Sequence, residues 1–473
     1  MVLRKALLLG ATLLLAPAAL GQTKKVSGAA QRKEVSITVY NQNFGLVREV
    51  RDVELGSGRV QLEFRDVAAN IQPETVSIKP LGGGKLEVLE QNYRYDLLSP
   101  GKLLEKHVGK KVRVHRWHEA LGREDSYDAK ILSVADGNPI LEINGEVVAD
   151  FPGRISFSSI PENLLAKPTL VWLLDSKAAK QKVEATYLTQ NLNWKSDYVL
   201  VVNDDDTAGD LTGWVTLTNN SGASYEHAKL KLVAGDVQRV SEGQDYERGE
   251  LASKTAAAKD DKGFREESFF EYHLYTLGQP TDVLEHEQKQ VTLLEAKNAK
   301  IKKQLIYYGQ QYWYRSQYGE LQKNQKVGVY LELENSKKNG LGMPLPKGIV
   351  RVYKADKSGS KQFIGEDNID HTPKDEKVKV KMGEAFDVVG DRKQMSWKTF
   401  GICTSESTWE IELRNHKDQD VEVQVWEPVG GDWEVLDESH KHHKEDAFTF
   451  TFDVKVPKNG KTKVKYRVRV RWC

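Results

Sequence analysis

The residues of this chain with metal-binding chemistry lie in two short clusters, and neither has the full spacing of a known site. His440-Lys-His-His443 offers imidazoles, the usual neutral ligands of transition metals, but a lysine interrupts them and we expect a solvated turn. Asp204-Asp-Asp-Thr-Ala-Gly209-Asp210 offers the clustered oxygens of a calcium loop. Val215 stands where an EF-hand requires a bidentate glutamate, so we expect a charged hairpin loop there. We therefore assign no metal ligand.

Motifs for nucleotide binding and hydrolysis are also incomplete. Gly82-Gly-Gly-Lys85 lacks the spacing of a phosphate loop. His118-Glu-Ala-Leu-Gly122 and His286-Glu-Gln-Lys-Gln290 lack the second histidine of a zinc protease, and no Gly-x-Ser-x-Gly elbow occurs. We assign no catalytic residue and no cofactor. A hydrolase of glycans or cell-wall material remains the alternative, because one sequence cannot show a carboxylate pair assembled from distant strands.

A run of aromatic residues gives the first candidate binding surface. Tyr307-Tyr-Gly-Gln-Gln-Tyr-Trp-Tyr314 is followed by Tyr318. Planar rings can stack on sugar rings while their polar tips bond hydroxyl groups. The alternative is that alternate rings pack within a sheet. We select Tyr312, Trp313 and Tyr314 as the candidate surface.

A stripe of cations gives the second candidate surface. Side chains of a strand point to opposite faces with period two, so alternate residues share a face. The six cations of this stripe are Lys461, Lys463, Lys465, Arg467, Arg469 and Arg471. One interpretation is edge protection of a terminal strand, with acidic residues such as Asp453 opposite. The other is docking to an anionic surface, such as a phosphorylated envelope polymer or lipid headgroups.

The elements that must position these residues are mostly strands, since apolar and polar residues alternate along most of the chain. Residues 448–456 and 461–472 alternate most clearly, and Asn459-Gly460 between them is typical of a tight hairpin turn. We also predict a strand at 285–304. The fold class is mainly β, with several antiparallel modules.

The chain is too long for one core, since single cores stop growing near roughly 250 to 300 residues. Short strands separated by Asp136-Gly137 and Asn144-Gly145 indicate a small SH3-like barrel. The strands of the last segment fit a small immunoglobulin-like sandwich. The predicted segments are a signal peptide at 1–21, a linker at 22–33, an N-terminal β module at 34–98, the barrel at 99–165, a central β domain at 166–400 with a mobile loop at 241–262, and the sandwich at 401–473.

The first 21 residues have the composition of a secretory signal peptide. Arg4 and Lys5 precede an apolar run of about 15 residues, shorter than the roughly 20 that span a bilayer. Small residues at Ala19 and Gly21 predict cleavage before Gln22. We expect an exported protein, periplasmic or extracellular, with no transmembrane span in the mature chain. Losing two of 69 basic residues against 68 acidic ones changes the formal charge from +1 to about −1, so we expect no nucleic-acid partner.

Two cysteines, Cys403 and Cys473, exclude a disulfide-dense scaffold. In an oxidising compartment they could form one bridge. The sequence does not show whether they meet.

Several stretches resemble a bacterial family known as domain of unknown function 4139, whose relatives include mucoidy-inhibitor-A-like proteins. They are Tyr40-Asn-Gln-Asn-Phe-Gly-Leu-Val47, Leu192-Asn-Trp194, Tyr198, Trp214-Val-Thr-Leu-Thr-Asn-Asn-Ser-Gly222, Ala228-Lys-Leu-Lys-Leu-Val-Ala-Gly-Asp236, Tyr272-His-Leu-Tyr275, Leu341-Gly-Met-Pro-Leu-Pro-Lys-Gly348 and Phe363-Ile-Gly-Glu-Asp367. The resemblance implies an exported, β-rich protein. It assigns no activity and therefore carries over no catalytic residue.

Our leading hypothesis is a non-enzymatic envelope protein whose β modules bind an anionic envelope polymer or a protein partner. An exposed aromatic or cationic face without a cleft would favour binding. Two carboxylates about 5 to 9 Å apart in a cleft would favour the hydrolase.

Overall fold

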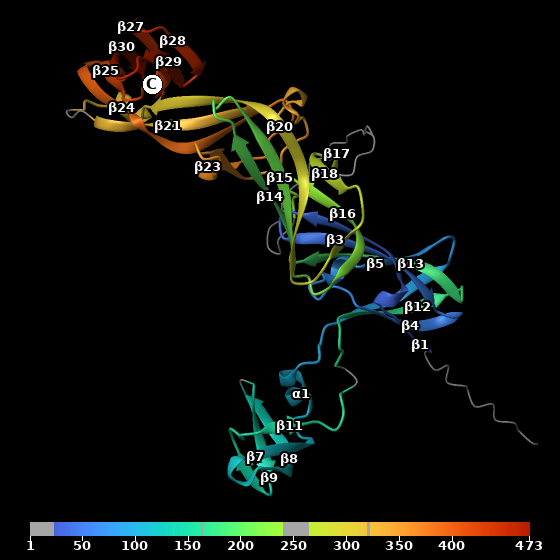
Figure 1. Cartoon of the computed structure of the whole chain (residues 1–473). Coiled ribbons are helices and arrows are strands. Elements are labelled where there is room, and N and C mark those ends of the chain that lie inside the picture. Colours follow the sequence, from blue (N-terminus) through green and yellow to red (C-terminus); the bar gives the residue numbers. More distant parts are fainter. Residues whose placement is uncertain (1–22, 136, 162–163, 240–263, 319–321) are drawn as a thin grey trace, which may run out of the picture. The chain divides into compact units, whose positions relative to one another are not determined.

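The computed structural model of the chain is mainly β and describes residues 23–135, 137–161, 164–239, 264–318 and 322–473 (Figure 1). The predicted signal peptide lies outside the described residues, as does the loop predicted at 241–262. The chain forms two compact units. The first comprises Met1–Ile37, Leu46–Asn191 and Asn220–Ala228, and the second comprises Thr38–Gly45, Leu192–Asn219 and Lys229–Cys473.

The first unit contains a four-stranded sheet in which β1 runs parallel to its neighbour. Its strands, in spatial order, are β1 (Thr23–Ser27), β4 (Gly58–Arg65), β12 (Thr169–Ser176) and β6 (Leu86–Arg94). Four strands of another sheet are hydrogen-bonded side by side in the order β2 (Arg32–Tyr40), β3 (Phe44–Glu54), β13 (Lys180–Gln190) and β5 (Ser77–Leu81). The core of this unit buries Trp172 together with the guanidinium of Arg51, which lies 3.6 Å from the ring centroid of Phe64.

A five-stranded antiparallel module also belongs to the first unit. It contains α1 (Pro100–Lys106), β7 (Lys111–His118), β8 (Arg123–Ala135), β9 (Asn138–Ile143), β10 (Glu146–Val148) and β11 (Arg154–Ser156). Asn144 and Gly145, with φ of 51° and 86°, form the turn between β9 and β10, as two-residue hairpins require. Its buried core is small, comprising Val112, Val114, Ala129, Ile131 and Leu141.

The second unit is dominated by one long sheet (Figure 1). Its first strands, in spatial order, are β23 (Lys361–Ile369), β22 (Gly348–Ala355), β14 (Leu192–Val202), β15 (Ala208–Asn219), β20 (Glu287–Tyr308), β21 (Gln322–Glu334) and β24 (Lys377–Phe400). Three shorter strands of this unit are β17 (Phe264–Phe269), β18 (Tyr272–Leu277) and β19 (Thr281–Val283). Strand β16 (Tyr225–Ala234) belongs to the first unit up to Ala228 and to the second unit from Lys229. The strand predicted at 285–304 is confirmed from Glu287 onward as part of β20, whereas residues 285 and 286 form a turn before it.

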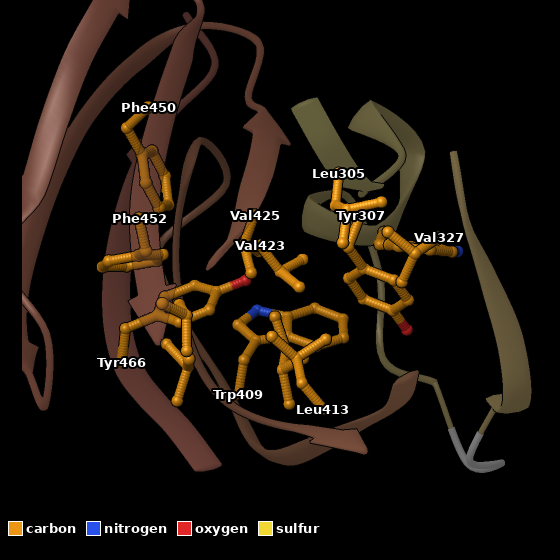
Figure 2. Packing of buried hydrophobic residues seen from close by; sticks show 14 of the residues in the cluster. Leu305, Tyr307, Val327, Trp409, Leu413, Val423, Val425, Phe450, Phe452 and Tyr466 are labelled. Carbon is orange, nitrogen blue, oxygen red and sulfur yellow. The ribbon is translucent and has the colours of Figure 1, made fainter. Parts of the chain in front are cut away.

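The sheet continues beyond β24 into a two-layered C-terminal part. Its strands are β25 (Thr404–Asn415), β26 (Val421–Pro428), β27 (Asp432–Glu438), β28 (His442–Asp446), β29 (Thr449–Val456) and β30 (Gly460–Arg471). One layer has the order β24-β25-β30-β27, while β26 pairs with β20 and β29, and β29 pairs with β28. Figure 2 shows Phe450, Phe452 and Tyr466 packed in the core between these strands.

This core takes residues from well before the expected boundary at 401. Leu305 and Tyr307 of β20 and Val327 of β21 pack in it beside Trp409 and Leu413 (Figure 2). The long strands β20, β21 and β24 pass from the middle of the unit into this C-terminal part. A segment beginning at 401 would therefore lack part of its own core.

The hairpin predicted around Asn459-Gly460 is wrong. Asn459 has the expected positive φ of 48°, but β29 and β30 are not ladder partners. The ring of Tyr466 on β30 lies 5.6 Å from Phe450 and 5.2 Å from Phe452 on β29, measured between centroids. The turn therefore connects two layers whose apolar faces pack on each other.

Candidate functional site

The predicted aromatic surface is largely part of the core. Residues Gln311–Tyr314 form a 3-10 turn, in which successive side chains point in different directions. Trp313 and Tyr314 are only 3% and 1% exposed, whereas Tyr312 is 52% exposed. The selection of Trp313 and Tyr314 as surface residues is therefore wrong. The alternative that alternate rings pack within a sheet holds for Tyr307 of β20, which is 1% exposed, whereas Trp313 and Tyr314 pack in the same core from the turn that follows this strand.

Tyr314 belongs to a buried polar network. Its hydroxyl donates to Glu427 Oε2 at 2.6 Å and lies 2.8 Å from the hydroxyl of Tyr466. Arg392 Nη1 lies 2.7 Å from Glu427 Oε1, and its guanidinium is 4.6 Å from the ring centroid of Trp313. Burial, and then the nearby Glu427 carboxylate, raise the pKa of Tyr314 well above its usual value. The network holds the core together and does not face solvent.

The cationic stripe lies on an interior strand of its sheet. Strand β30 pairs with β25 on one side and β27 on the other, so edge protection cannot explain it. Asp453, expected opposite the stripe, lies on β29 and pairs with Gln424. The neighbouring carboxylates come instead from β25 and β27.

Five of the six cations have carboxylate partners on these neighbouring strands. The N–O distances are 3.5 Å for Lys461–Glu412, 2.8 Å for Lys463–Glu410, 2.9 Å for Lys465–Glu410, 2.6 Å for Arg469–Glu406 and 3.9 Å for Arg471–Asp432. Arg467 lies between Thr408 and Asp437 in the ladder. The stripe is thus one column of a face with acidic columns on both sides, which reduces its attraction for an external anion.

The two clusters considered for metal binding are engaged by other side chains. Asp206 lies 2.6 Å from the ammonium groups of both Lys303 and Lys354. His442 Nδ1 lies 2.7 Å from Glu438, and His443 Nε2 lies 3.7 Å from Asp453. The described part of the chain contains no group of three or more His, Cys, Asp or Glu side chains arranged to hold a metal ion.

A groove of about 750 Å³ in the first unit carries two carboxylates, Asp52 and Glu54 on β3. Side chains two apart on a strand share a face and are spaced by about 7 Å along the strand, which is within the range considered for a hydrolase. However, Lys180 Nζ lies 2.6 Å from Glu54 and lowers the pKa of that carboxyl, first through a hydrogen bond. Lys33 lies 3.7 Å from Asp52. A general acid requires the opposite, a raised pKa, so the environment of Glu54 does not favour that role.

A group of polar side chains on the five-stranded module resembles the serine nucleophile and histidine base of a hydrolase. His115 Nε2 lies 2.9 Å from Ser156 Oγ, and its Nδ1 lies 2.8 Å from Ser126 Oγ and 3.6 Å from Glu124. Sequence reasoning missed it because the residues come from three strands. Ser156 is the last residue of strand β11, and no helix follows it whose backbone N–H groups would converge on an oxyanion within the described residues 157–161. We interpret the network as a surface hydrogen-bonded cluster.

A second group of aromatic residues lies on the outer face of β26, β20 and β21. The ring of Tyr308 on β20 lies 5.7 Å from Trp426 on β26 and 6.2 Å from Tyr330 on β21, measured between centroids. Tyr308 is 40% exposed, and the other two rings are half-buried. With Lys379 of β24, we call these residues the aromatic patch.

The position of the Tyr330 ring in the aromatic patch depends on Gly328, which has no side chain. A Cβ added to Gly328 would lie 2.8 Å from Cε2 of Tyr330, so the ring of Tyr330 lies over the glycine. Gly328 pairs with Ile306 of β20, two residues before Tyr308. The absence of a side chain at Gly328 thus allows the ring of Tyr330 to lie close to Tyr308.

Lys379 supplies the charge of the patch. Its Nζ lies 4.7 Å from the ring centroid of Trp426 and 5.3 Å from that of Tyr330. Burial lowers the pKa of Lys379, and the carboxylates of Glu332 and Glu445 partly oppose this. Burial, and then the neighbouring Tyr330, raise the pKa of Tyr308 to about 12. Of these residues only Tyr308 belongs to the predicted aromatic run, because the others come from strands distant in sequence.

Fold and site together define a mainly β protein of antiparallel modules with an aromatic and cationic surface patch. Within the described residues no helix is long and apolar enough to cross a membrane. The sequence profile of the family described as Domain of unknown function (DUF4139) matches residues 183–473, which is more than half of the chain. The protein belongs to this family. The match includes the aromatic patch and excludes the resembling stretch that begins at Tyr40. No curated protein matches the chain.

Proposed function

We propose that the protein is an exported, non-enzymatic binding protein of the cell envelope that holds a glycan polymer at the aromatic patch. The observation that carries this proposal is the convergence at the surface of three rings from β20, β21 and β26. Rings present flat apolar faces for the C–H faces of sugars, while their polar tips bond hydroxyl groups.

The exposure of the patch supports binding over a purely structural role. Tyr307, the neighbour of Tyr308 on the same strand, is 1% exposed and packs in the core. Tyr308 points to the other face and is 40% exposed. Rings needed only for packing would gain more from complete burial, since burial of apolar area stabilises by about 25 cal/mol per Å².

The state of the carboxylates supports the absence of catalysis. Glu54 in the large groove, and Glu410 beside the cationic stripe, are hydrogen-bonded to lysines that lower their pKa. Ionised, paired carboxylates do not supply the protonated acid that glycoside hydrolysis requires.

The finer architecture and the location are part of the proposal. The five-stranded module supports an SH3-like barrel, and the two packed layers of the C-terminal part support an immunoglobulin-like sandwich. The charged start and short apolar run support export to the periplasm or beyond.

Affinity electrophoresis through gels containing soluble polysaccharides tests the proposal. We expect Tyr308→Ala and Trp426→Ala to weaken retention about tenfold, since a ring contact contributes up to about 1.5 kcal/mol beyond its buried area. Tyr312→Ala is the matched control, because Tyr312 is 52% exposed and lies outside the patch. Equal retention of all three variants and the wild type would rule out the patch as the binding site.

A further inference from the structure

The ammonium of Lys379 has an unusual environment for a surface cation. Its contacts are with the rings of Trp426 and Tyr330, which attract a cation but accept no directional hydrogen bond of normal strength. Among the described residues, no carboxylate oxygen lies within 4.0 Å of its Nζ. By contrast, Lys303 and Lys354 both have a carboxylate oxygen of Asp206 at 2.6 Å.

The carboxylates nearest in the ladder are engaged elsewhere. Glu332 lies directly opposite Lys379, but it pairs with Lys377 at 3.0 Å and accepts a hydrogen bond from Gln304 at 3.4 Å. Lys302 and Lys377 place like charge near Lys379, and Glu445 contributes opposite charge. Lys379 therefore remains a half-buried cation with three donors and no anionic partner in contact among the described residues.

These surroundings restrict the ligand. An anion cannot approach the ring faces themselves, because the face of an aromatic ring is negative. It can reach Lys379 at the margin of the rings. A ligand that satisfies both parts of the patch has an apolar face for Tyr308 and Trp426 and a charged group beside that face.

We infer that the aromatic patch selects an anionic glycan, with sugar rings stacked on Tyr308 and Trp426 and a carboxylate or phosphate group held by Lys379. This inference rests on the proposed function and adds the charge of the ligand. The charge-assisted hydrogen bonds from the ammonium to the anion supply the acceptor that Lys379 lacks among its described neighbours. The rings also exclude part of the solvent from this ion pair, which strengthens it.

Two polymers with the same backbone test the inference. Polygalacturonate carries a carboxylate on every sugar, and its fully methyl-esterified form carries none. We expect the full-length wild type to bind the acid form at least fivefold more tightly than the ester at low salt. We expect Lys379→Gln to bind both forms as the wild type binds the ester, and Lys379→Arg to keep the preference for the acid form.

Matched controls separate this inference from the proposed function. Lys377→Gln removes a nearby lysine that is paired with Glu332, and we expect it to keep the preference. Tyr308→Ala should lose affinity for both polymers. Unchanged thermal midpoints of all variants show that each is folded.

Each outcome has a defined meaning. If Lys379→Gln retains the preference for the acid form, the inference is overturned while stacking on the patch stands. If Tyr308→Ala and Trp426→Ala leave binding to both polymers unchanged, the proposed function fails and the inference fails with it. If inorganic phosphate at equal charge displaces polygalacturonate as well as free galacturonate oligomers do, Lys379 is a small-anion site and the selection of a glycan is overturned.

Discussion

At the scale of single residues, the buried ion pair of Arg392 and Glu427 has a large expected effect on stability. Both side chains are almost fully buried, and Arg392 also stacks near Trp313 and Tyr307. Removing one member of a buried pair leaves the other charge without compensation, which costs about 3 to 5 kcal/mol. The pair therefore makes the fold of the C-terminal part depend on both residues.

We predict that Glu427→Gln lowers the free energy of unfolding by about 3 to 5 kcal/mol, because the Arg392 charge remains buried. Urea unfolding followed by tryptophan fluorescence measures this. Glu422→Gln is the control, since Glu422 lies on the same strand, β26, and is exposed. A difference below about 1 kcal/mol between the two variants would mean that Arg392 finds another partner or reaches solvent.

At the scale of elements, basic and acidic side chains occupy separate neighbouring strands on the charged face around β30. Cations of β30 lie between the acidic residues of β25 and those of β27. Exposed ion pairs of this kind contribute about 0 to 1 kcal/mol each and weaken with salt. We therefore expect the stripe to stabilise the sheet and not to bind the polymer.

We predict that replacing Lys465, Arg467 and Arg469 together with glutamine leaves retention on polygalacturonate unchanged. The same variant should lose about 1 to 2 kcal/mol of stability at low salt and less at high salt. Affinity electrophoresis and urea unfolding at two salt concentrations measure both effects. A sharp fall in retention with the fold intact would instead make the stripe the docking surface.

The start of β25 and the end of the chain after β30 are joined in the structure by a disulfide. Cys403 and Cys473 are bonded, with a Cα–Cα distance of 5.6 Å, and the backbone N–H of Trp472 donates to the carbonyl of Cys403 at 2.9 Å. This hydrogen bond ends the pairing of the two strands beside the bridge.

We predict no free thiol in the unfolded, unreduced protein by thiol titration. Reduction should destabilise the protein by roughly 4 kcal/mol at most, the chain-entropy value for a loop of about 70 residues. The double variant Cys403→Ser, Cys473→Ser should behave like the reduced protein. Two titratable thiols per chain in the unreduced sample would show that the bridge is absent.

At the scale of the whole molecule, strand β1 begins at Thr23, one residue after the predicted cleavage site. Lys24 Nζ lies 2.7 Å from the buried carboxylate of Glu63, and Arg51 donates to the carbonyl of Ser27 at 3.0 Å. We predict a mature N-terminus near Gln22, found by N-terminal sequencing of exported protein. Cytosolic protein that retains Met1 would contradict export.

Much of the fold could be predicted from the sequence because alternation is local. Residues Phe450, Phe452 and Val454 are buried as the alternation predicted, and so are Val464 and Tyr466 on β30. The period of a strand fixes which side chains share a face, and hydrophobicity fixes which face is buried. The same reasoning predicted the exposed cationic face of β30.

The neighbours of each strand were decided only by the tertiary structure. Asn459-Gly460 predicts a sharp turn, but whether the turn joins ladder partners or opposite layers depends on distant strands. The aromatic patch has the same origin, since Tyr308, Tyr330, Trp426 and Lys379 come from four strands. The alternation of apolar and polar residues indicates which side chains share a face of a strand, but it does not indicate which strands are hydrogen-bonded neighbours. The sequence by itself therefore determined a mainly β chain with two-faced strands, while long-range packing decided which faces meet and which rings remain at the surface.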